Sequence, residues 1–483
     1  MSEPVQNPDA GEARERNSRE AQPQEPADTR DAAETQDPEE AQDTAETQDT
    51  AETQPSGTVT RYQSLALLGS SVLAAASTLV VTMIAQRALT GSELTEFLLF
   101  WSALFTVTGI ITGLQPEITR AVGTARAHAA VDGAPAPQGA RVVTVAAALG
   151  AVAGALVLVS SPLWAGQQIP HSAAVGVTVM AVGVFLYALQ ATISGVAAGE
   201  DRWYLFATVG GLESAGRLLL MLAVALLIPS LAGLEVVTVI PMGLWLILAL
   251  VTFSGRRLWV ARADVPAGRL TVNILWSFLS SAAAAVLMMG FPNVLKASGA
   301  AESEPVVLGT LILAISITRS PIMIPLQAFQ GVAVSAFLKQ RHRPVAAFIK
   351  PAAAVVAVGA VGALAAYLVG PLLFRLIYPP AAGAESAYEA AASGLSLGAL
   401  VFASALLALM TLSGNMALAV NQHRIYLAGW VVAAVVTLGL AFLLPAPLVP
   451  RAVVALAVGP VCGFVVHMVG VSMASRAEET RAE

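Results

Sequence analysis

Cysteine and charge are both scarce in this 483-residue chain. The single cysteine, Cys462, excludes intramolecular disulfides and a cysteine metal site. The five histidines lack the spacing of metal ligands, so we expect neither a metal nor a cofactor. Charged residues make up 12% of the chain and hydrophobic residues 56%, and the mean hydropathy is +0.70. A soluble protein of this length would not show such values, so the composition predicts a polytopic membrane protein.

The N-terminal segment is the exception to this composition. Residues 1–57 hold 16 Asp and Glu against four Arg, and the stretch AETQDTAETQDTAETQ repeats a polar unit. Such a segment cannot bury enough apolar surface to offset the entropy that it loses on ordering. We therefore expect a disordered acidic cytoplasmic tail over 1–57, which acts as a solubilising spacer or, alternatively, as a docking segment. An apolar signal-peptide core is also missing, and we expect no cleaved leader.

Long apolar runs dominate the rest of the chain. A bilayer core about 30 Å thick is spanned by about 20 apolar residues of helix. Twelve segments qualify, at approximately 64–86, 96–118, 142–163, 172–197, 205–228, 234–254, 271–295, 306–337, 351–377, 391–417, 425–444 and 450–474. The sequence therefore predicts an all-α membrane protein with about 12 transmembrane helices.

Basic residues decide the expected orientation, because Lys and Arg accumulate in short cytoplasmic loops. If the N-terminus is inside, sixteen basic residues flank the cytoplasmic ends of the spans and four flank the outer ends. We therefore expect a multi-pass protein of the plasma (inner) membrane with both termini in the cytoplasm. Outside the acidic tail, this count leaves two basic residues inside spans, Arg217 and Arg319.

Two loops resemble each other and indicate an internal repeat. GEDRWYLFA precedes the fifth span and NQHRIYLAG the eleventh, which aligns Arg202 with Arg424. Parallel repeats occur in many transporters, with the substrate path between the halves. We therefore expect an N-terminal six-helix lobe over 58–255, a basic cytoplasmic linker over 256–270, a C-terminal six-helix lobe over 271–475 and a short cytoplasmic tail over 476–483.

An arginine at the centre of a span costs about 2.5–3.5 kcal/mol on insertion scales, so it must face protein or a wet cavity. Glu213 precedes Arg217 by four residues, and the two side chains can form a structural ion pair on one helix face. Arg319 has no acid within a turn, so another helix or a ligand must supply its anion. Glu213 is the one acidic residue that we expect to be buried. We predict that Arg319, Arg217 and Glu213 contribute to a substrate-binding cavity.

Pro321 and Pro325 follow Arg319 in the same span. Each proline lacks a backbone N–H and distorts the preceding turn. Carbonyl groups freed in this way are tolerated at membrane depth only inside protein or beside a wet cavity. We therefore predict a helix kink next to Arg319, with a static kink for packing as the alternative.

Polar residues elsewhere in the spans give weaker signals. Glu117 and Arg120 lie three residues apart at the end of the second span, and Asn415 lies near the cytoplasmic end of the tenth. His467 lies inside the last span, where we expect a hydrogen bond between helices.

Three stretches together carry a family resemblance. In TMIAQRALTGSELTEFLLFWSALFTVTGIITGLQPEITRAVG, a helix ending in Ala-x-Arg is followed by a short outer turn and a helix ending in Thr-Arg. GVAAGEDRWYLFATVGGLESAGRLLL joins the fourth and fifth spans, and ITRSPIMIPLQAFQGVAVSAFLK places Arg, Pro and Gln in the eighth. Over residues 60–475 the chain resembles the polysaccharide-transport, Wzx-like branch of the multidrug/oligosaccharidyl-lipid/polysaccharide (MOP) flippase superfamily, whose members have twelve or more helices in two six-helix lobes.

The resemblance implies a transporter that flips a polyprenyl-(pyro)phosphate-linked oligosaccharide, or another cell-envelope glycan precursor, from the inner to the outer leaflet by alternating access. Such a role belongs to polysaccharide biosynthesis or cell wall biogenesis. Arg319 and Arg217 would attract diphosphate and sugar-acid groups, which a guanidinium binds through forked hydrogen bonds. Gate or head-group contacts would fall to Arg87, Arg120, Glu117 and Asn415.

The implied partners are the lipid-linked glycan and membrane lipids, with cytoplasmic or membrane glycan-assembly enzymes as a further option and no nucleic acid. Three other functions stay open. A MATE-like small-molecule exporter would need acidic residues deep in a lobe. A multipass lipid-dependent glycosyltransferase or ligase would need carboxylates or a base in a sizeable outer loop. An accessory scaffold would use the acidic tail to recruit enzymes. We expect a transporter and not an enzyme.

Overall fold

The computed structural model describes residues 61–89, 91–132, 139–251, 258–299, 305–339, 344–380, 383–420 and 422–482. The predicted acidic tail over 1–57 lies outside the described residues, as do Arg256 and Arg257 of the predicted linker. Within the described part, twelve helices are long and apolar enough to cross a membrane. Strands are absent from these residues, apart from a single bridge between Arg141 and Arg262. The predicted all-α fold with about 12 transmembrane helices is therefore confirmed.

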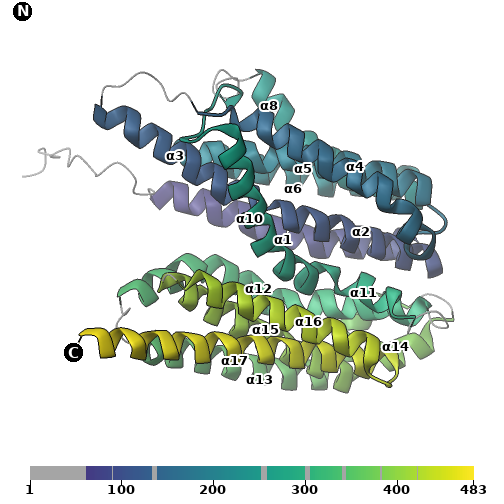
Figure 1. The fold of residues 1–483 in the computed structure, drawn as a ribbon. Helices are drawn as coiled ribbons and strands as arrows, with labels where there is room; N and C mark the ends of the chain where they lie inside the picture. The colour runs from purple at the N-terminus through teal and green to yellow at the C-terminus, as the bar shows by residue number, and fades with distance from the viewer. Residues whose placement is uncertain are drawn as a thin grey trace, which may run out of the picture. The chain divides into compact units, whose positions relative to one another are not determined.

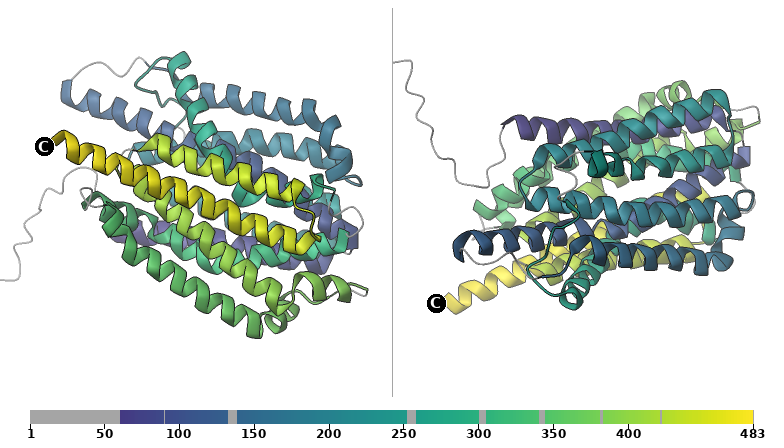
Figure 2. Two further views of the ribbon diagram at one scale, coloured as in Figure 1. Left: turned by 60° about the horizontal axis from the view of Figure 1, so that its bottom comes forward. Right: turned by 90° about the horizontal axis from the view of Figure 1, so that it is seen from above.

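The helices fall into two groups joined by one further span (Figures 1 and 2). The first group comprises α1 (Arg61–Ala88), α2 (Gly91–Ile111), α3 (Leu114–Asp132), α4 (Val142–Gln168), α5 (Ala173–Gly199), α6 (Trp203–Leu227), α7 (Leu231–Val239), the 3₁₀ turn η1 (Ile240–Gly243) and α8 (Trp245–Val251). The joining span comprises α10 (Ala267–Ala285), the π-helical turn η2 (Val286–Gly290) and α11 (Phe291–Ala297). The second group comprises α12 (Pro305–Lys339), α13 (Pro344–Ile377), α14 (Glu385–Ala391), α15 (Gly394–Ala419), α16 (His423–Leu443) and α17 (Leu448–Ala482).

The packing pattern of the first group recurs in the second. In the first group α5 lies against α3 and α4, and in the second group α15 lies against α12 and α13 in the same way. Likewise α7 packs on α5, and α17 packs on α15. Small residues permit these close contacts in the membrane. A side chain at Gly154 of α4, for example, would place its Cβ 2.9 Å from the Ala181 carbonyl oxygen of α5.

Buried polar side chains also join helices within a group. The imidazole of His467 on α17 lies 2.9 Å from Ser413 Oγ of α15 and 3.0 Å from the Tyr426 carbonyl oxygen of α16. The predicted hydrogen bond of His467 between helices is therefore confirmed. The ring fits because Gly429 has no side chain, whose Cβ would lie 2.1 Å from His467 Nε2.

The joining span is discontinuous and contacts both groups. Its first part, α10, packs along α2 and α3 of the first group and touches α16 of the second. The α-helix gives way to a π-helical turn at Val286–Gly290 and resumes at Phe291, with Pro292 in the first turn. Turns of this kind are frequent at functional sites, because they release backbone groups from the regular helical pattern.

We name the two ends of the helices for reference. The terminal end is where α1 begins and α17 ends, on the left of Figure 1. The distal end is where α1 meets α2, α4 meets α5, and α6 meets α7. The orientation predicted from loop charge would place the distal end outside the cell.

Candidate functional site

A cavity of about 450 Å³ lies where α1 and α2 face α12. Both groups contribute, and the π-helical turn and α11 complete the wall. Its lining consists of Ser71, Ala74, Thr78, Thr82, Leu98, Trp101, Ser102, Phe105, Met288, Met289, Pro292, Ile312, Ile315, Ser316, Arg319, Ser320 and Met323. The volume is within the range of about 300–1,000 Å³ that is typical of ligand pockets.

The helical period explains which residues face this cavity. Residues three or four positions apart lie on one helix face. Ser71, Ala74, Thr78 and Thr82 follow this spacing on α1 and give the cavity a small, weakly polar wall. On α12 the same spacing from Ile312 through Ser316 and Arg319 to Met323 places the arginine on the cavity face. Sequence reasoning found the arginine, but not the helices that face it.

Arg319 is the one charged side chain in the described lining of the cavity. Its guanidinium NH1 donates a hydrogen bond to the carbonyl oxygen of Met288 in the π-helical turn. Its Nε is buried and has no hydrogen-bond acceptor among the described residues. A guanidinium has five N–H donors, so a single carbonyl leaves most of its hydrogen-bonding capacity for other acceptors.

The carbonyl that Arg319 contacts is available for a simple covalent reason. In an α-helix the N–H of residue 292 would donate to the carbonyl of residue 288, but residue 292 is a proline and has no N–H. Pro292 therefore cannot supply the α-helical donor to this carbonyl, and Arg319 donates to it. This contact ties α12 to the joining span and fixes where the charge lies.

Arg217 has different surroundings. Its NH2 forms an ion pair with Glu213 Oε1 on the same helix, and Glu213 Oε2 accepts a hydrogen bond from Gln190 Nε2 at 2.6 Å. The guanidinium also lies over two aromatic rings, 5.8 Å from the centre of the Trp101 ring and 5.2 Å from that of Phe105. Such cation–π contacts stabilise a desolvated cation. Glu213 thus compensates the charge of Arg217 inside the first group, although Arg217 Nε, like that of Arg319, has no hydrogen-bond partner among the described residues.

Trp101 and Phe105 separate Arg217 from the cavity. Both rings line the cavity, whereas Arg217 and Glu213 do not, and the side chain of Arg217 is 6% exposed. The ring centres of Trp101 and Phe105 are 4.5 Å apart, so the two form a continuous aromatic wall. The structure therefore brings Arg319 into the cavity and places Arg217 behind this wall.

The two prolines of the eighth span lie within an unbroken α-helix. The helix α12 runs from Pro305 to Lys339 through both Pro321 and Pro325. Pro321 lines a separate apolar pocket of about 290 Å³ formed with α13 and α15, on the side of α12 away from the Arg319 cavity. The side chain of Pro325 lies outside the described residues.

Of the residues predicted at helix ends, Glu117 and Arg120 pair with each other, whereas Arg87 and Asn415 lie elsewhere. At the terminal end, Arg120 donates to Glu117 at 2.7 Å and to Asp264 at 3.0 Å, and Glu117 also accepts from Asn273 Nδ2 at 3.0 Å. Asp264 and Asn273 were missed because both lie far along the chain from α3. Arg87, at the distal end, is exposed, and its NH1 donates to the Met83 carbonyl oxygen at 3.3 Å. Asn415 is buried within α15 and does not line the cavity.

Hydrogen bonds at the distal end close the cavity between the two groups. Thr82 Oγ1 lies 2.8 Å from the hydroxyl of Tyr378, just after α13. Gln86 Nε2 donates to the Pro379 carbonyl oxygen at 2.5 Å. Thr95 Oγ1 donates to the Pro305 carbonyl oxygen at 3.0 Å. Opening the cavity at this end would require breaking these contacts.

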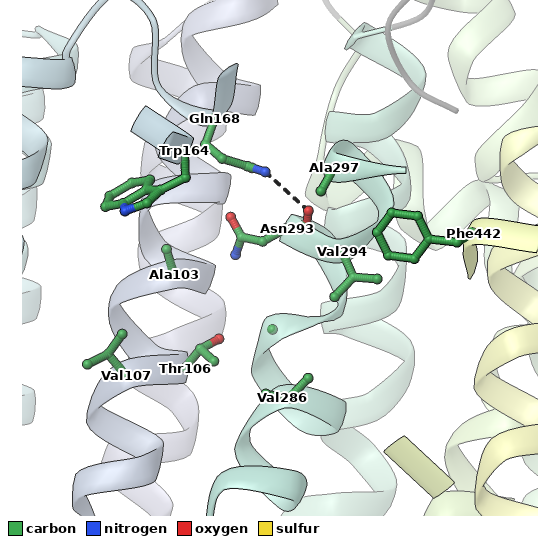
Figure 3. Close-up of a pocket in the computed structure, with 11 residues that line it drawn as sticks. Ala103, Thr106, Val107, Trp164, Gln168, Val286, Asn293, Val294, Ala297 and Phe442 are labelled. Atoms are coloured by element: carbon green, nitrogen blue, oxygen red, sulfur yellow. Dashed lines mark hydrogen bonds between the residues drawn. The ribbon is translucent and has the colours of Figure 1, made fainter. Parts of the chain in front are cut away.

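A second space lies on the other side of α2 (Figure 3). This pocket of about 350 Å³ is walled by Trp164 of α4 and Phe442 of α16, with Thr106 of α2 below them. Gln168 Nε2 donates to the Asn293 carbonyl oxygen at 3.2 Å across its upper part. The described lining of this pocket holds no charged side chain, so charge distinguishes the Arg319 cavity from it.

Two buried acids correct the expectation that Glu213 alone is buried. Glu96 on α2 is 3% exposed and Glu235 on α7 is 0% exposed. Both lie in the second turn of an apolar helix. Their burial results from the α4–α5 connection, which covers them with His171 and Ser172. Among the described residues, no group of three or more His, Cys, Asp or Glu side chains is suited to hold a metal ion.

Solved structures with the same fold are transporters of the MOP superfamily. A multidrug resistance MATE family transporter in an inward-facing conformation matches 86% of this chain and 99% of its own, with a TM-score of 0.65 and 15% identity. An outward-facing MATE family structure gives a TM-score of 0.60 with 16% identity, over 86% of this chain and 97% of its own. The lipid II flippase MurJ in an inward closed conformation gives a TM-score of 0.61 with 9% identity, over 86% and 88%. The chain therefore has the MOP transporter fold, as the resemblance implied, whereas the Wzx-like branch stays a prediction.

Sequence relatives define the family more closely. The uncharacterized protein Rv1510 of Mycobacterium tuberculosis (strain ATCC 25618 / H37Rv) is 33% identical over 416 residues, which cover 86% of this chain and 92% of the relative. The uncharacterized protein Rv3630 of the same strain is 33% identical over 422 residues, which cover 86% and 94%. The chain belongs to the family of these mycobacterial proteins. No family model matches the chain.

Proposed function

We propose that this protein flips a polyprenyl-(pyro)phosphate-linked glycan from the inner to the outer leaflet of the plasma membrane by alternating access. The observation that carries the proposal is the guanidinium of Arg319, the one charge in the described lining of the cavity between the two groups. A guanidinium binds phosphate oxygens through paired, charge-assisted hydrogen bonds, which suits a diphosphate head group. The hydroxyl groups of Ser71, Thr78 and Ser316 in the same lining suit sugar hydroxyls.

The energetics of burial support the same ligand. A guanidinium at membrane depth is costly unless it faces protein polar groups or a cavity. Here one carbonyl oxygen compensates Arg319, and its buried Nε has no acceptor among the described residues. An anionic ligand would complete the hydrogen bonds of the guanidinium and lower this cost. The same charge disfavours an organic cation as the transported molecule.

Alternating access is supported by where the closing contacts lie. The two groups are joined at the distal end through Thr82 with Tyr378, Gln86 with Pro379 and Thr95 with Pro305. These are single hydrogen bonds between neutral groups, each worth about 0.5–1.5 kcal/mol, so ligand binding can offset their loss. With the distal end outside, this conformation would precede release of the head group to the outer leaflet.

A MATE-like small-molecule exporter is the second candidate, favoured by two buried carboxylates in the first group, Glu96 and Glu235. The positive charge and the modest volume of the cavity would then select a small organic anion.

Depletion of the protein in its own host tests the proposed substrate. A lipid-linked glycan should accumulate on the inner leaflet, where an impermeant enzyme that cleaves its head group cannot reach it in intact cells. Re-expression of the native chain should restore cleavage. Normal amounts of every lipid-linked intermediate, together with increased retention of a small organic anion, would favour the exporter instead.

A further inference from the structure

Two buried carboxylates at the distal end of the first group take no part in the Arg319 cavity. Glu96 lies in the second turn of α2 and Glu235 in the second turn of α7. Their whole side chains are shielded, with exposures of 3% and 0%. An isolated ionised carboxylate is expensive to bury, so each must be hydrogen-bonded, paired with a cation or neutral.

Glu96 has the partners of an ionised carboxylate. Its Oε1 accepts hydrogen bonds from the backbone N–H groups of His171 at 2.9 Å and Ser172 at 2.8 Å. Its Oε2 lies 2.7 Å from Nδ1 of the His171 ring, which is 65% exposed. Donors that converge on both oxygens favour the charged form of a carboxylate.

Glu235 lacks such partners. Its Oε1 lies 2.6 Å from Ser172 Oγ, and its Oε2 is buried with no hydrogen-bond partner among the described residues. Its side chain packs against Gly176 of α5, where an added Cβ would lie 3.3 and 3.4 Å from its two oxygens. A charged carboxylate in this position would be nearly uncompensated.

The hydroxyl of Ser172 links the two acids and allows the protons to be counted. Ser172 Oγ lies 3.0 Å from Glu96 Oε1 and 2.6 Å from Glu235 Oε1. A hydroxyl has one proton and can donate to one of these oxygens, so the other contact needs a proton on the carboxyl side. Glu96 already accepts from N–H groups, and therefore the extra proton belongs on Glu235, which donates to Ser172 Oγ while Ser172 donates to Glu96.

Charged groups on the surrounding elements do not replace this proton. The elements packed against α7 are α2, α5, α6 and η1. The α2 helix contributes Glu96, and the connection before α5 contributes Ser172 and the ring of His171. The charged side chains of α6, Glu213 and Arg217, are bonded to each other, and η1 has none. The described surroundings therefore leave Glu235 without a buried cation.

We propose that Glu235, bridged through Ser172 to Glu96, is a proton-binding site at the distal end of the first group. Its ligand is a single proton on the Glu235 carboxyl, and binding forms one O–H bond and breaks none. Release of the proton leaves two buried carboxylates on either side of one hydroxyl, which repel each other. The site is independent of the proposed glycan, because none of its residues lines the Arg319 cavity.

Infrared spectroscopy of the purified full-length protein in lipid nanodiscs tests this site without any transport assay. A protonated carboxyl has a C=O stretch that a carboxylate lacks. We expect such a band at neutral pH, its disappearance at alkaline pH and its loss in Glu235→Gln. Glu93→Gln is the matched control, because Glu93 lies on α2 but is exposed, and the band should persist in it.

Two results would overturn the proposal. One is a band of unchanged intensity in Glu235→Gln. The other is loss of the native band on addition of sodium at constant pH, which would identify a metal cation as the ligand. If Glu235→Gln does not fold, Ser172→Ala keeps both carboxyls and removes the bridge. The band of Ser172→Ala should then disappear at a different pH from the native band, and an identical titration would contradict the proposed bridge.

Discussion

Arg217 and Arg319 both lie inside spans, one in each helical group, but they have opposite surroundings. Arg217 on α6 has an acid four residues before it and two aromatic rings beneath it, all from the first group. Arg319 on α12 has one carbonyl oxygen from the joining span and otherwise faces the cavity. Depth in the membrane therefore does not distinguish the two arginines. We propose that Arg319 is the functional one, because it has no anionic partner among the described residues and lines a space that a ligand can enter.

The largest effect is expected at Arg319. Replacing it by Met removes the one charge from the described lining and should abolish growth-supporting export in a strain depleted of the native protein. Arg319→Lys should retain part of the activity, because the charge remains and the forked donor geometry is lost. Arg126→Gln is the matched control, since Arg126 is exposed and pairs with Asp201 on the surface. Full export by Arg319→Met would contradict the proposed role of Arg319 in transport.

A large effect on stability, and not on ligand binding, is expected at Arg217. Breaking a buried ion pair on one side leaves an uncompensated charge and costs about 3–5 kcal/mol. Arg217→Met and Glu213→Gln should therefore each lower the unfolding temperature of the purified protein strongly. The double variant should cost less than the sum of the two.

The same variants also test whether Arg217, like Arg319, contacts the transported ligand. If Arg217→Met unfolds at the native temperature and yet loses transport, the aromatic wall of Trp101 and Phe105 does not isolate it from the ligand. The comparison between a compensated and an uncompensated arginine would then fail for the first group.

A smaller effect is expected at the distal closure. Tyr378→Phe removes the hydrogen bond with Thr82, worth about 1 kcal/mol, and should increase the population open at the distal end about fivefold. Labelling of a cysteine at Thr78, in a Cys462→Ala background, by an impermeant thiol reagent added outside would report this shift. Unchanged labelling would mean that Thr82 and Tyr378 do not hold the cavity shut.

The smallest effect is expected at Arg120. The Arg120 side chain is 43% exposed, whereas its partners Glu117 and Asp264 are 10% and 11% exposed. Water screens the exposed guanidinium, and pairs of exposed groups contribute about 0–1 kcal/mol, so Arg120→Gln should lower the unfolding temperature less than Arg217→Met. If Arg120→Gln lowers the unfolding temperature as much as Arg217→Met does, the contact between α3 and the residues before α10 contributes strongly to the stability of the fold.

Much of the fold could be predicted from the sequence, because the bilayer imposes one strong requirement on each span. The predicted span 142–163 became α4 at Val142–Gln168, and 425–444 became α16 at His423–Leu443. The local pairing of Glu213 with Arg217 could also be predicted, since four residues separate neighbours on a helix face.

Contacts between distant parts of the chain could not be predicted in the same way. Arg319 donates to the carbonyl oxygen of Met288, which is 31 residues away and to which Pro292 cannot donate. The aromatic wall in front of Arg217 comes from α2, and the cover over Glu96 and Glu235 comes from the α4–α5 connection. For the two buried acids, the sequence offered one signal of an unusual environment, which is that neither Glu96 nor Glu235 has a basic residue within a helical turn.

Transbilayer movement of a labelled polyprenyl-pyrophosphate glycan in proteoliposomes tests whether flipping requires Arg319. Native protein and the Arg126→Gln control should move the lipid between leaflets, and Arg319→Met, reconstituted at equal density, should not. Equal rates for the native protein and Arg319→Met would contradict the account.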